Sequence, residues 1–271
     1  MRTLAAAAGP WRFAPPTGQG RVHGGTVGCA AASSLAVVGD VLVGDELAVL
    51  RALGQGTDHR DAESILRDGG WTSCGAGDWA IALRSPSGVH AARISPFDPA
   101  APYNAELYRR AVHTGQVPRL EAEVELDGGA SLLVLEFLHP VELDRAAAFH
   151  QAIAVGAPEL AELSELVAAV HLEARRELPW CGPVDINPTN VMQAQGGRLV
   201  LIDPFYADGP NLYGTILTDP ARVAATIPEN RRRHMFDLPL RSSGPPTPGV
   251  AAQMRDAITA ADAHQHSPRT D

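Results

Sequence analysis

The chain has 271 residues and a formal net charge of −9, and all 22 of its basic residues are arginine. The absence of lysine excludes Schiff-base chemistry and the Gly-Lys phosphate loop, and the acidic balance argues against non-specific nucleic-acid binding. Cys29, Cys74 and Cys181 are too widely separated for a disulfide framework or a zinc motif, and no apolar stretch reaches the length of a membrane span. We therefore expect a cytoplasmic protein without nucleic-acid or membrane partners.

The first half of the chain is predicted to combine strands with a few helices. Residues 1–34 show no clear periodicity and are expected to form a loosely packed arm. Asp58 is the predicted N-cap of a short helix, and a glycine-containing turn follows Trp71. Helices are predicted over residues 45–53, 58–66 and 102–114. Strands are predicted over residues 35–43, 79–83, 89–94, 120–126 and 131–137.

The second half is predicted to be mostly helical. The helix over residues 158–178 carries an apolar stripe of Leu160, Leu163, Val167 and Val170. Other helices are predicted over residues 143–153, 210–217, 219–226, 228–235 and 250–263. A loop over 184–192 precedes a buried strand over 199–202, with a Gly-Gly turn between them. The order indicates an α+β fold of two lobes, with a cleft near the hinge-like residues 136–140.

The segment from Pro183 to Tyr206, PVDINPTNVMQAQGGRLVLIDPFY, is the most specific feature of the sequence. Asp185 is followed five residues later by Asn190, and Asp203 ends the apolar strand. Carboxylate and amide oxygens are the hard ligands that suit Mg²⁺, and a further carboxylate can accept a proton from a hydroxyl group. A loop followed by a turn and a strand can bring the three side chains to one cleft.

This segment resembles the catalytic loop and metal-binding Asp of the protein kinase-like superfamily, in its aminoglycoside-phosphotransferase and small-molecule-kinase form. The resemblance is strongest over residues 185–203 and extends weakly over residues 71–217. It implies that Asp185 is the catalytic base and that Asn190 and Asp203 bind Mg²⁺. Pro183 stands where the family has a histidine, which leaves the loop without its usual internal hydrogen-bond donor.

The resemblance also implies a nucleotide site in the amino-terminal lobe. Gly75 and Gly77 fit the family's glycine-rich turn, and Arg93 takes the place of the phosphate-binding lysine, with Glu106 on the next helix as its partner. Arginine keeps the positive charge but has a bulkier, planar head. Glu136, Phe137 and Leu138 are implied to line the adenine pocket. The expected cofactors are ATP and Mg²⁺.

The implied fold is a small β-rich N-lobe and a mostly helical C-lobe with a shortened C-terminal part. Its predicted divisions are an N-terminal extension over residues 1–68, an N-lobe over 69–138, a C-lobe over 139–263 and a tail over 264–271.

Each functional interpretation has a structural alternative. Asp185 and Asn190 can be turn residues, Arg93 can pair with a surface carboxylate, and Glu106 can be a solvated helix residue. His171, on the long helix, is interpreted as a packed or solvent-facing residue and not as a metal ligand.

Only 68 residues follow Asp203, too few for the activation segment and helical subdomain of a protein kinase. We therefore expect an ATP-dependent phosphotransferase that acts on the hydroxyl of a small molecule. Asp208 and Asp219 suggest an acidic rim and a cationic acceptor. The alternative is a catalytically weak or inactive kinase-like module that binds a nucleotide or a partner protein, which the missing lysine and Pro183 favour.

Overall fold

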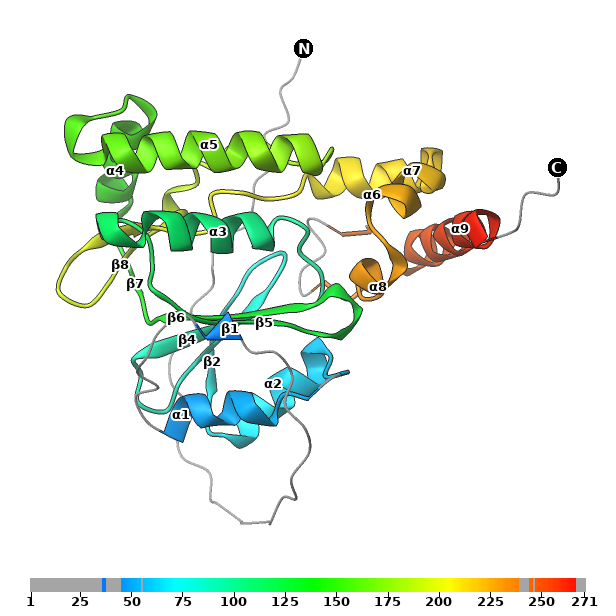
Figure 1. Ribbon diagram of the computed structural model, residues 1–271, viewed down its shortest axis with the longest axis horizontal. Coiled ribbons are helices and arrows are strands. Elements are labelled where there is room, and N and C mark those ends of the chain that lie inside the picture. The colour runs from blue at the N-terminus through cyan, green and yellow to red at the C-terminus, as the bar shows by residue number, and fades with distance from the viewer. Residues whose placement is uncertain (1–35, 38–44, 55, 239–243, 246, 267–271) are drawn as a thin grey trace.

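The structure is a computed structural model that describes residues 36–37, 45–54, 56–238, 244–245 and 247–266 (Figure 1). Over these residues the chain forms a six-stranded antiparallel sheet in the order β1-β5-β6-β4-β3-β2 and a three-stranded antiparallel sheet in the order β7-β8-β9. The strands of the larger sheet are β1 (Ala36–Val37), β2 (Thr72–Ala76), β3 (Ile81–Arg84), β4 (His90–Ser95), β5 (Leu120–Glu125) and β6 (Ser131–Glu136). Those of the smaller sheet are β7 (His139–Pro140), β8 (Val191–Gln193) and β9 (Leu199–Leu201).

Helices surround the larger sheet and make up most of the chain after residue 140. They are α1 (Asp45–Ala48), α2 (His59–Asp68), α3 (Ala101–Ala111), α4 (Leu143–Ala154), α5 (Ala161–Glu177), α6 (Gly209–Thr218), α7 (Pro220–Thr226), α8 (Glu229–Arg232) and α9 (Pro248–His266). Asp58 caps α2 as predicted, because its Oδ1 accepts the N–H groups of Arg60 at 2.8 Å and Asp61 at 3.0 Å.

Strand β6 shows how the larger sheet is buried on both faces. Leu132 and Val134 pack in one apolar cluster with Leu66 of α2, whereas Leu133 and Leu135 pack in another cluster with residues of α3 and α5. Successive side chains of a strand point to opposite faces, so a strand with four consecutive apolar residues, Leu132–Leu135, must lie between two layers. Figure 1 shows these layers, with α1 and α2 on one side of the sheet and α3, then α5, on the other.

The α+β fold class is confirmed, and most predicted elements lie within a few residues of their expected positions. The predicted stripe on the long helix is buried as expected, at Leu160, Leu163, Val167 and Val170. Helix α2 and the 3-10 turn Val49–Ala52, which the sequence assigns to an extension, share an apolar core with the sheet. Residues 1–35 and most of the predicted strand over 35–43 lie outside the described residues, and α9 continues to His266.

Two strands are absent from the prediction. The segment directly after Trp71 forms strand β2, which precedes the glycine-containing turn at Gly77, and the loop expected over residues 184–192 ends in β8. Both strands are short, and β2 is polar and contains Gly75. Their strand conformation depends on pairing with β3 and β9, and pairing of this kind leaves little trace in a local pattern.

No helix in the described part of the chain has both the length and the apolar character needed to cross a membrane.

Candidate active site

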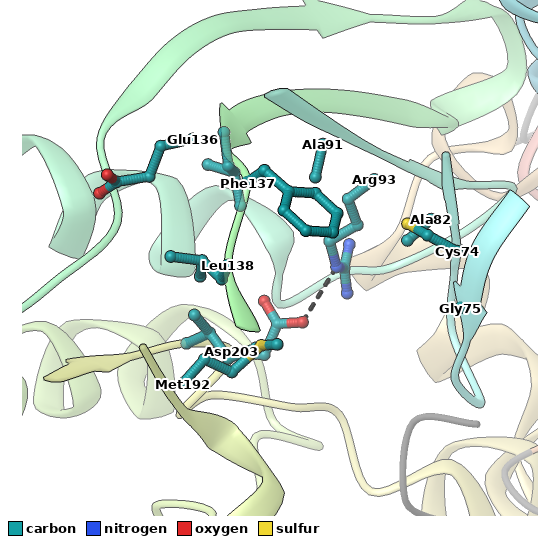
Figure 2. Close-up of a pocket in the computed structure, with 12 residues that line it drawn as sticks. Cys74, Gly75, Ala82, Ala91, Arg93, Glu136, Phe137, Leu138, Met192 and Asp203 are labelled. Carbon is teal, nitrogen blue, oxygen red and sulfur yellow. Dashed lines mark hydrogen bonds and ion pairs between the residues drawn. The ribbon is translucent and has the colours of Figure 1, made fainter. Parts of the chain in front are cut away.

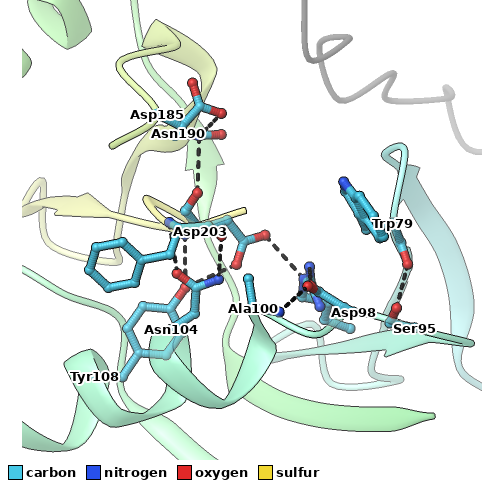
Figure 3. A network of polar contacts seen from close by, with 11 residues as sticks. Trp79, Ser95, Asp98, Ala100, Asn104, Tyr108, Asp185, Asn190 and Asp203 are labelled. Carbon is cyan, nitrogen blue, oxygen red and sulfur yellow. Dashed lines mark hydrogen bonds and ion pairs between the residues drawn. The ribbon is translucent and has the colours of Figure 1, made fainter. Parts of the chain in front are cut away.

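The structure brings Asp185, Asn190 and Asp203 together at one end of the smaller sheet (Figure 3). The side-chain amide of Asn190 donates to Asp185 Oδ2 at 2.9 Å and to the backbone oxygen of Asp203 at 3.3 Å. The backbone N–H of Asp185 donates to the oxygen of Pro204 at 2.8 Å. Because Asn190 uses its nitrogen in these contacts, its side-chain oxygen stays available as a ligand.

The loop that carries Asp185 is held in shape by its own polar groups. Asp185 Oδ1 accepts the N–H of Asn187 at 2.9 Å, and Asn187 Oδ1 accepts the N–H of Thr189 at 3.1 Å, which caps the short 3-10 turn Pro188–Asn190. His150 of α4 contacts the backbone oxygen of Asn187 through Nε2 at 2.9 Å. Burial lowers the pKa of His150, so a neutral ring holds the loop from outside.

Asp203 has a φ of +43°, and no other non-glycine residue in the described part of the chain has a positive φ. This conformation costs about 1–3 kcal/mol unless the surroundings stabilise it. Tyr108 of α3 accepts the N–H of Asp203 at 2.9 Å and donates to its Oδ1 at 3.2 Å. One turn earlier, Asn104 bonds both the N–H and the oxygen of Phe205, at 3.1 and 2.9 Å. Helix α3 therefore determines the shape of the segment around Asp203.

Arg93, on β4, faces this segment and pairs with Asp203 (Figure 2), and it forms a second ion pair with Asp98. Its Nη2 lies 2.7 Å from Asp98 Oδ2, and its Nε lies 3.1 Å from Asp203 Oδ2. Burial alone would lower the pKa of Arg93, but Asp203 and Asp98 outweigh it and raise the pKa, so the side chain stays charged. Its Nη1 is buried and has no hydrogen-bond partner. An unsatisfied buried donor on a charged group is costly, so this atom is suited to an anionic ligand.

A pocket with a cavity volume of about 70 Å³ lies between the two sheets, beside Arg93 and Asp203. Its lining combines apolar side chains with the Arg93–Asp203 ion pair, and the residues are Cys74, Gly75, Ala82, Ala91, Arg93, Leu135, Glu136, Phe137, Leu138, Met192, Ile202 and Asp203. The lining therefore places apolar surface next to a charged group.

Several residues predicted for a nucleotide site lie at this pocket. Gly75 and Leu138 line it, and Gly77 lies in the β2–β3 turn, where its N–H donates to the oxygen of Ala80 at 2.8 Å. Glu136 lines the pocket, but its carboxylate accepts the N–H of Arg119 at 2.9 Å and pairs with Arg198. Figure 2 shows this carboxylate directed away from Arg93, so the side chain of Glu136 stabilises the hinge-like segment instead of facing a ligand.

The predicted pairing of Glu106 with Arg93 is wrong. Glu106 bonds Arg109 at 3.2 Å and Arg110 at 2.7 Å on its own helix, and Asp98 takes its expected place beside Arg93. Pairs three and four residues apart on a helix are neighbours, so these two arginines reach Glu106 without any tertiary contact.

The two acidic residues of the predicted rim also cap helices. Asp208 accepts the N–H of Asn211, and Asp219 accepts that of Arg222, so the two carboxylates cap α6 and α7. The acidic rim and the cationic acceptor stay predictions.

His171 supplies the hydrogen bond that Pro183 cannot provide. From α5, its Nε2 lies 2.8 Å from the backbone oxygen of Gly182, and its ring stacks on Phe205 with centroids 5.8 Å apart and planes at 3°. The imidazole thus connects the start of the loop to the segment after Asp203. Pro183 itself supplies no donor, and this contact comes from α5, outside the loop.

Four residues shape this site although they are not among the predicted site residues: Asp98, Asn104, Tyr108 and His171. Asn104 and Tyr108 are each 1% exposed, and Asp98 is 8% exposed. A spacing of four residues puts Asn104 and Tyr108 on one helix face, and this was the only signal available in the sequence.

Comparison with known proteins adds no relative: no protein-family model and no curated protein sequence matches the chain.

Proposed function

We propose that the protein is an ATP- and Mg²⁺-dependent phosphotransferase that transfers a phosphoryl group to the hydroxyl of a small molecule. The observation that carries the proposal is one constellation: Asp185, Asn190 and Asp203 joined by hydrogen bonds, opposite a buried Arg93 with an unpartnered nitrogen. Phosphoryl transfer depends mainly on positioning and electrostatic stabilisation, and these residues supply both.

The site fits a divalent cation by charge and by donor type. Asp98, Asp185 and Asp203 bring three carboxylates against the single guanidinium of Arg93, a formal excess of negative charge. Asn190 Oδ1 and the carboxylate of Asp203 are hard oxygen donors of the kind that Mg²⁺ prefers. These two residues would hold the ion, which supplies charge neutralisation to the phosphate oxygens when it is bound.

The residues around the pocket suit the parts of a nucleotide by charge and polarity. Arg93 lies on the third strand of the β2-β3-β4 meander, directly before helix α3, where a kinase-like site carries its phosphate-binding lysine. Its Nη1 would donate to phosphate oxygens, while Ala91, Met192 and Ile202 offer apolar surface to a base. Arginine donates in forks that suit phosphate.

In this proposal Asp185 accepts the proton of the acceptor hydroxyl. Its carboxylate is oriented by the N–H of Asn187 and the amide of Asn190, so the oxygens keep a fixed direction. A hydroxyl bound within hydrogen-bond reach would pass its proton to this carboxylate as the oxygen attacks phosphorus.

The test is transfer of labelled γ-phosphate from ATP to a panel of aminoglycosides, nucleosides and sugars. We expect Asp185→Asn to lower turnover by about 10²–10⁴-fold, the usual contribution of a general base. The matched control is Asp256→Asn, at an exposed position of α9, which should keep full activity. A chain that neither transfers phosphate to any acceptor nor hydrolyses ATP would contradict the proposal.

The role of Arg93 has its own test. We expect Arg93→Lys to keep measurable MgATP binding, because lysine retains a cation at the phosphate position. If Arg93→Ala binds MgATP as tightly as the unmodified chain, Arg93 is not the phosphate ligand.

A second candidate function is a nucleotide- or partner-binding module without efficient catalysis. One observation favours it: both oxygens of the Asp203 carboxylate already have partners, Tyr108 and Arg93, so a metal ion must compete with them. A thermal-shift titration with MgATP separates the cases. Stabilisation that disappears in Asp203→Asn, without phosphate transfer, would indicate a binding module, and no stabilisation at any concentration would indicate a scaffold.

A further inference from the structure

A second polar cluster lies where helix α2 meets the chain just after α8. Asp58, His59 and His234 each offer a ligand atom there, and these three atoms lie within 4.8 Å of one another. The imidazole rings of His59 and His234 meet edge to face, with centroids 4.8 Å apart and planes at 66°. None of the three residues belongs to the site around Asp185 and Asp203.

The two histidines each carry a buried nitrogen without a partner. His59 is 8% exposed and its Nδ1 has no hydrogen bond, and the same holds for Nε2 of His234, whose side chain is 12% exposed. Buried polar atoms are hydrogen-bonded in the great majority of cases. Neither of these two nitrogens is hydrogen-bonded to the other ring. Two such atoms in adjacent rings therefore indicate a missing ligand that both would contact.

The partner must accept electron pairs from neutral imidazole. The unpartnered nitrogens of His59 and His234 can each supply one electron pair to a metal ion. Asp58 uses Oδ1 for both of its helix-capping hydrogen bonds, which leaves Oδ2 for an additional ligand. Two imidazole nitrogens and one carboxylate form a set that suits zinc, whereas Mg²⁺ and Ca²⁺ prefer oxygen alone.

Neighbouring groups hold His234 in the orientation that a ligand needs. Its Nδ1 lies 3.3 Å from Asp237 Oδ2, and metal-binding histidines commonly have this carboxylate contact on the nitrogen that does not bind the metal. Gly128 lies so close that a Cβ there would be 2.4 Å from Cδ2 of His234. The ring is thus fixed on both sides, with Nε2 directed away from Asp237.

The cluster lies on a seam that connects distant parts of the chain. Beside it, Asp127 donates its N–H to the oxygen of Thr57 at 2.8 Å, Arg60 pairs with Asp237 at 3.0 Å, and Arg233 pairs with Asp127. Helix α2 packs on the sheet, and Arg233 and Asp237 follow α8 in the helical part. An ion here would therefore fasten the helical part to the sheet.

We propose that Asp58, His59 and His234 bind one zinc ion, with water as the fourth ligand, and that the ion fastens helix α2 to the segment after α8. Tetrahedral bonds of about 2.0–2.1 Å put ligand atoms roughly 3.4 Å apart. Small rotations of the three side chains, on the surface of one helix and one loop, bring them to that spacing.

The test is zinc binding by the full chain without a histidine tag. The protein is stripped with EDTA, dialysed, and titrated with Zn²⁺ by calorimetry, and the metal that remains after a second dialysis is counted by mass spectrometry. We expect one equivalent of zinc per chain and a rise in the melting temperature on addition of zinc. His59→Ala and His234→Ala should each weaken binding at least 100-fold, and Asp237→Asn by about 10–100-fold.

The matched control is His113→Ala, which removes an exposed histidine paired only with Glu162 and should bind zinc as the unmodified chain does. If His234→Ala does not fold, Asp237→Asn and the stoichiometry of the unmodified chain still decide the matter. The proposal is overturned if the unmodified chain binds no zinc, or if binding survives in His59→Ala or His234→Ala, since the cysteines or the other histidines would then be the ligands.

Discussion

Replacing Tyr108 with phenylalanine removes one hydroxyl and little else. The hydroxyl accepts the N–H of Asp203 at 2.9 Å and donates to its carboxylate at 3.2 Å. Tyr108 is 1% exposed, so water cannot easily take over either bond. Burial, and secondly the charge of Asp203, raise the pKa of Tyr108 well above its usual value, so the hydroxyl keeps its proton and donates at every pH of interest.

The expected loss of stability follows from these two bonds. An unsatisfied buried N–H costs about 1–3 kcal/mol, and a hydrogen bond to a charged group contributes about 1.5–3 kcal/mol. Part of this is offset when Asp203 relaxes from its positive φ, so we expect Tyr108→Phe to lower the free energy of unfolding by about 3 kcal/mol. For a chain of this size, that is a fall of roughly 6–12 °C in melting temperature.

Urea unfolding followed by circular dichroism measures this difference. Tyr103→Phe is the matched control, because it makes the same change on the same helix. Its hydroxyl donates to Glu177 at 2.9 Å in an exposed contact, so we expect a loss below about 1 kcal/mol. If Tyr108→Phe is no more destabilising than Tyr103→Phe, then α3 does not hold Asp203 in place and the described geometry of the site is wrong.

Three other predictions concern packing and ionisation. Gly129→Ala should destabilise the fold by more than about 2 kcal/mol, because φ is +81° and a Cβ would lie 2.1 Å from the backbone oxygen of Arg231. Gly214→Ala should instead stabilise the fold by about 0.5–1 kcal/mol, because Gly214 lies within α6 and has open space around it. Thermal unfolding of both variants checks this, and equal effects would contradict it. Burial raises the pKa of Cys74 to about 11, so the rate at which iodoacetamide alkylates Cys74 should rise about tenfold per pH unit from pH 7 to 10. Peptide mass spectrometry measures this rate. A plateau near pH 9 would show that the pKa of Cys74 is not raised by burial. Burial lowers the pKa of His150, so below pH 6.5 the unfolded chain binds more protons than the folded chain, and the free energy of unfolding should fall as the pH drops below that value. In urea titrations, His150→Gln should weaken this pH dependence. If the free energy of unfolding of His150→Gln depends on pH as that of the unmodified chain does, His150 is not responsible.

The sequence predicted the local elements that depend on short-range patterns. The apolar stripe on α5 and the cap at Asp58 are confirmed because periodicity and capping act within a few residues. The sequence also predicted that Asp185, Asn190 and Asp203 lie in one cluster. The reason is that β8 and β9 form an antiparallel hairpin, so the residues before β8 and after β9 lie side by side. Strands β2 and β8 were missed because their conformation depends on partners that the local sequence does not contain.

Only the tertiary structure decided which side chains meet. Arg93 and Glu106 have the residue types for an ion pair, yet Asp98 binds Arg93, and Glu106 bonds Arg109 and Arg110 on its own helix. The hydrogen bond that Pro183 cannot make comes from α5. Partners of this kind are selected by the packing of whole helices against the sheet, which places atoms from distant positions within 3 Å. The sequence alone shows that the chain has no lysine. That Arg93 lies beside Asp203 with a buried, unpartnered nitrogen is decided by the tertiary structure, which places β4 opposite the turn after β9.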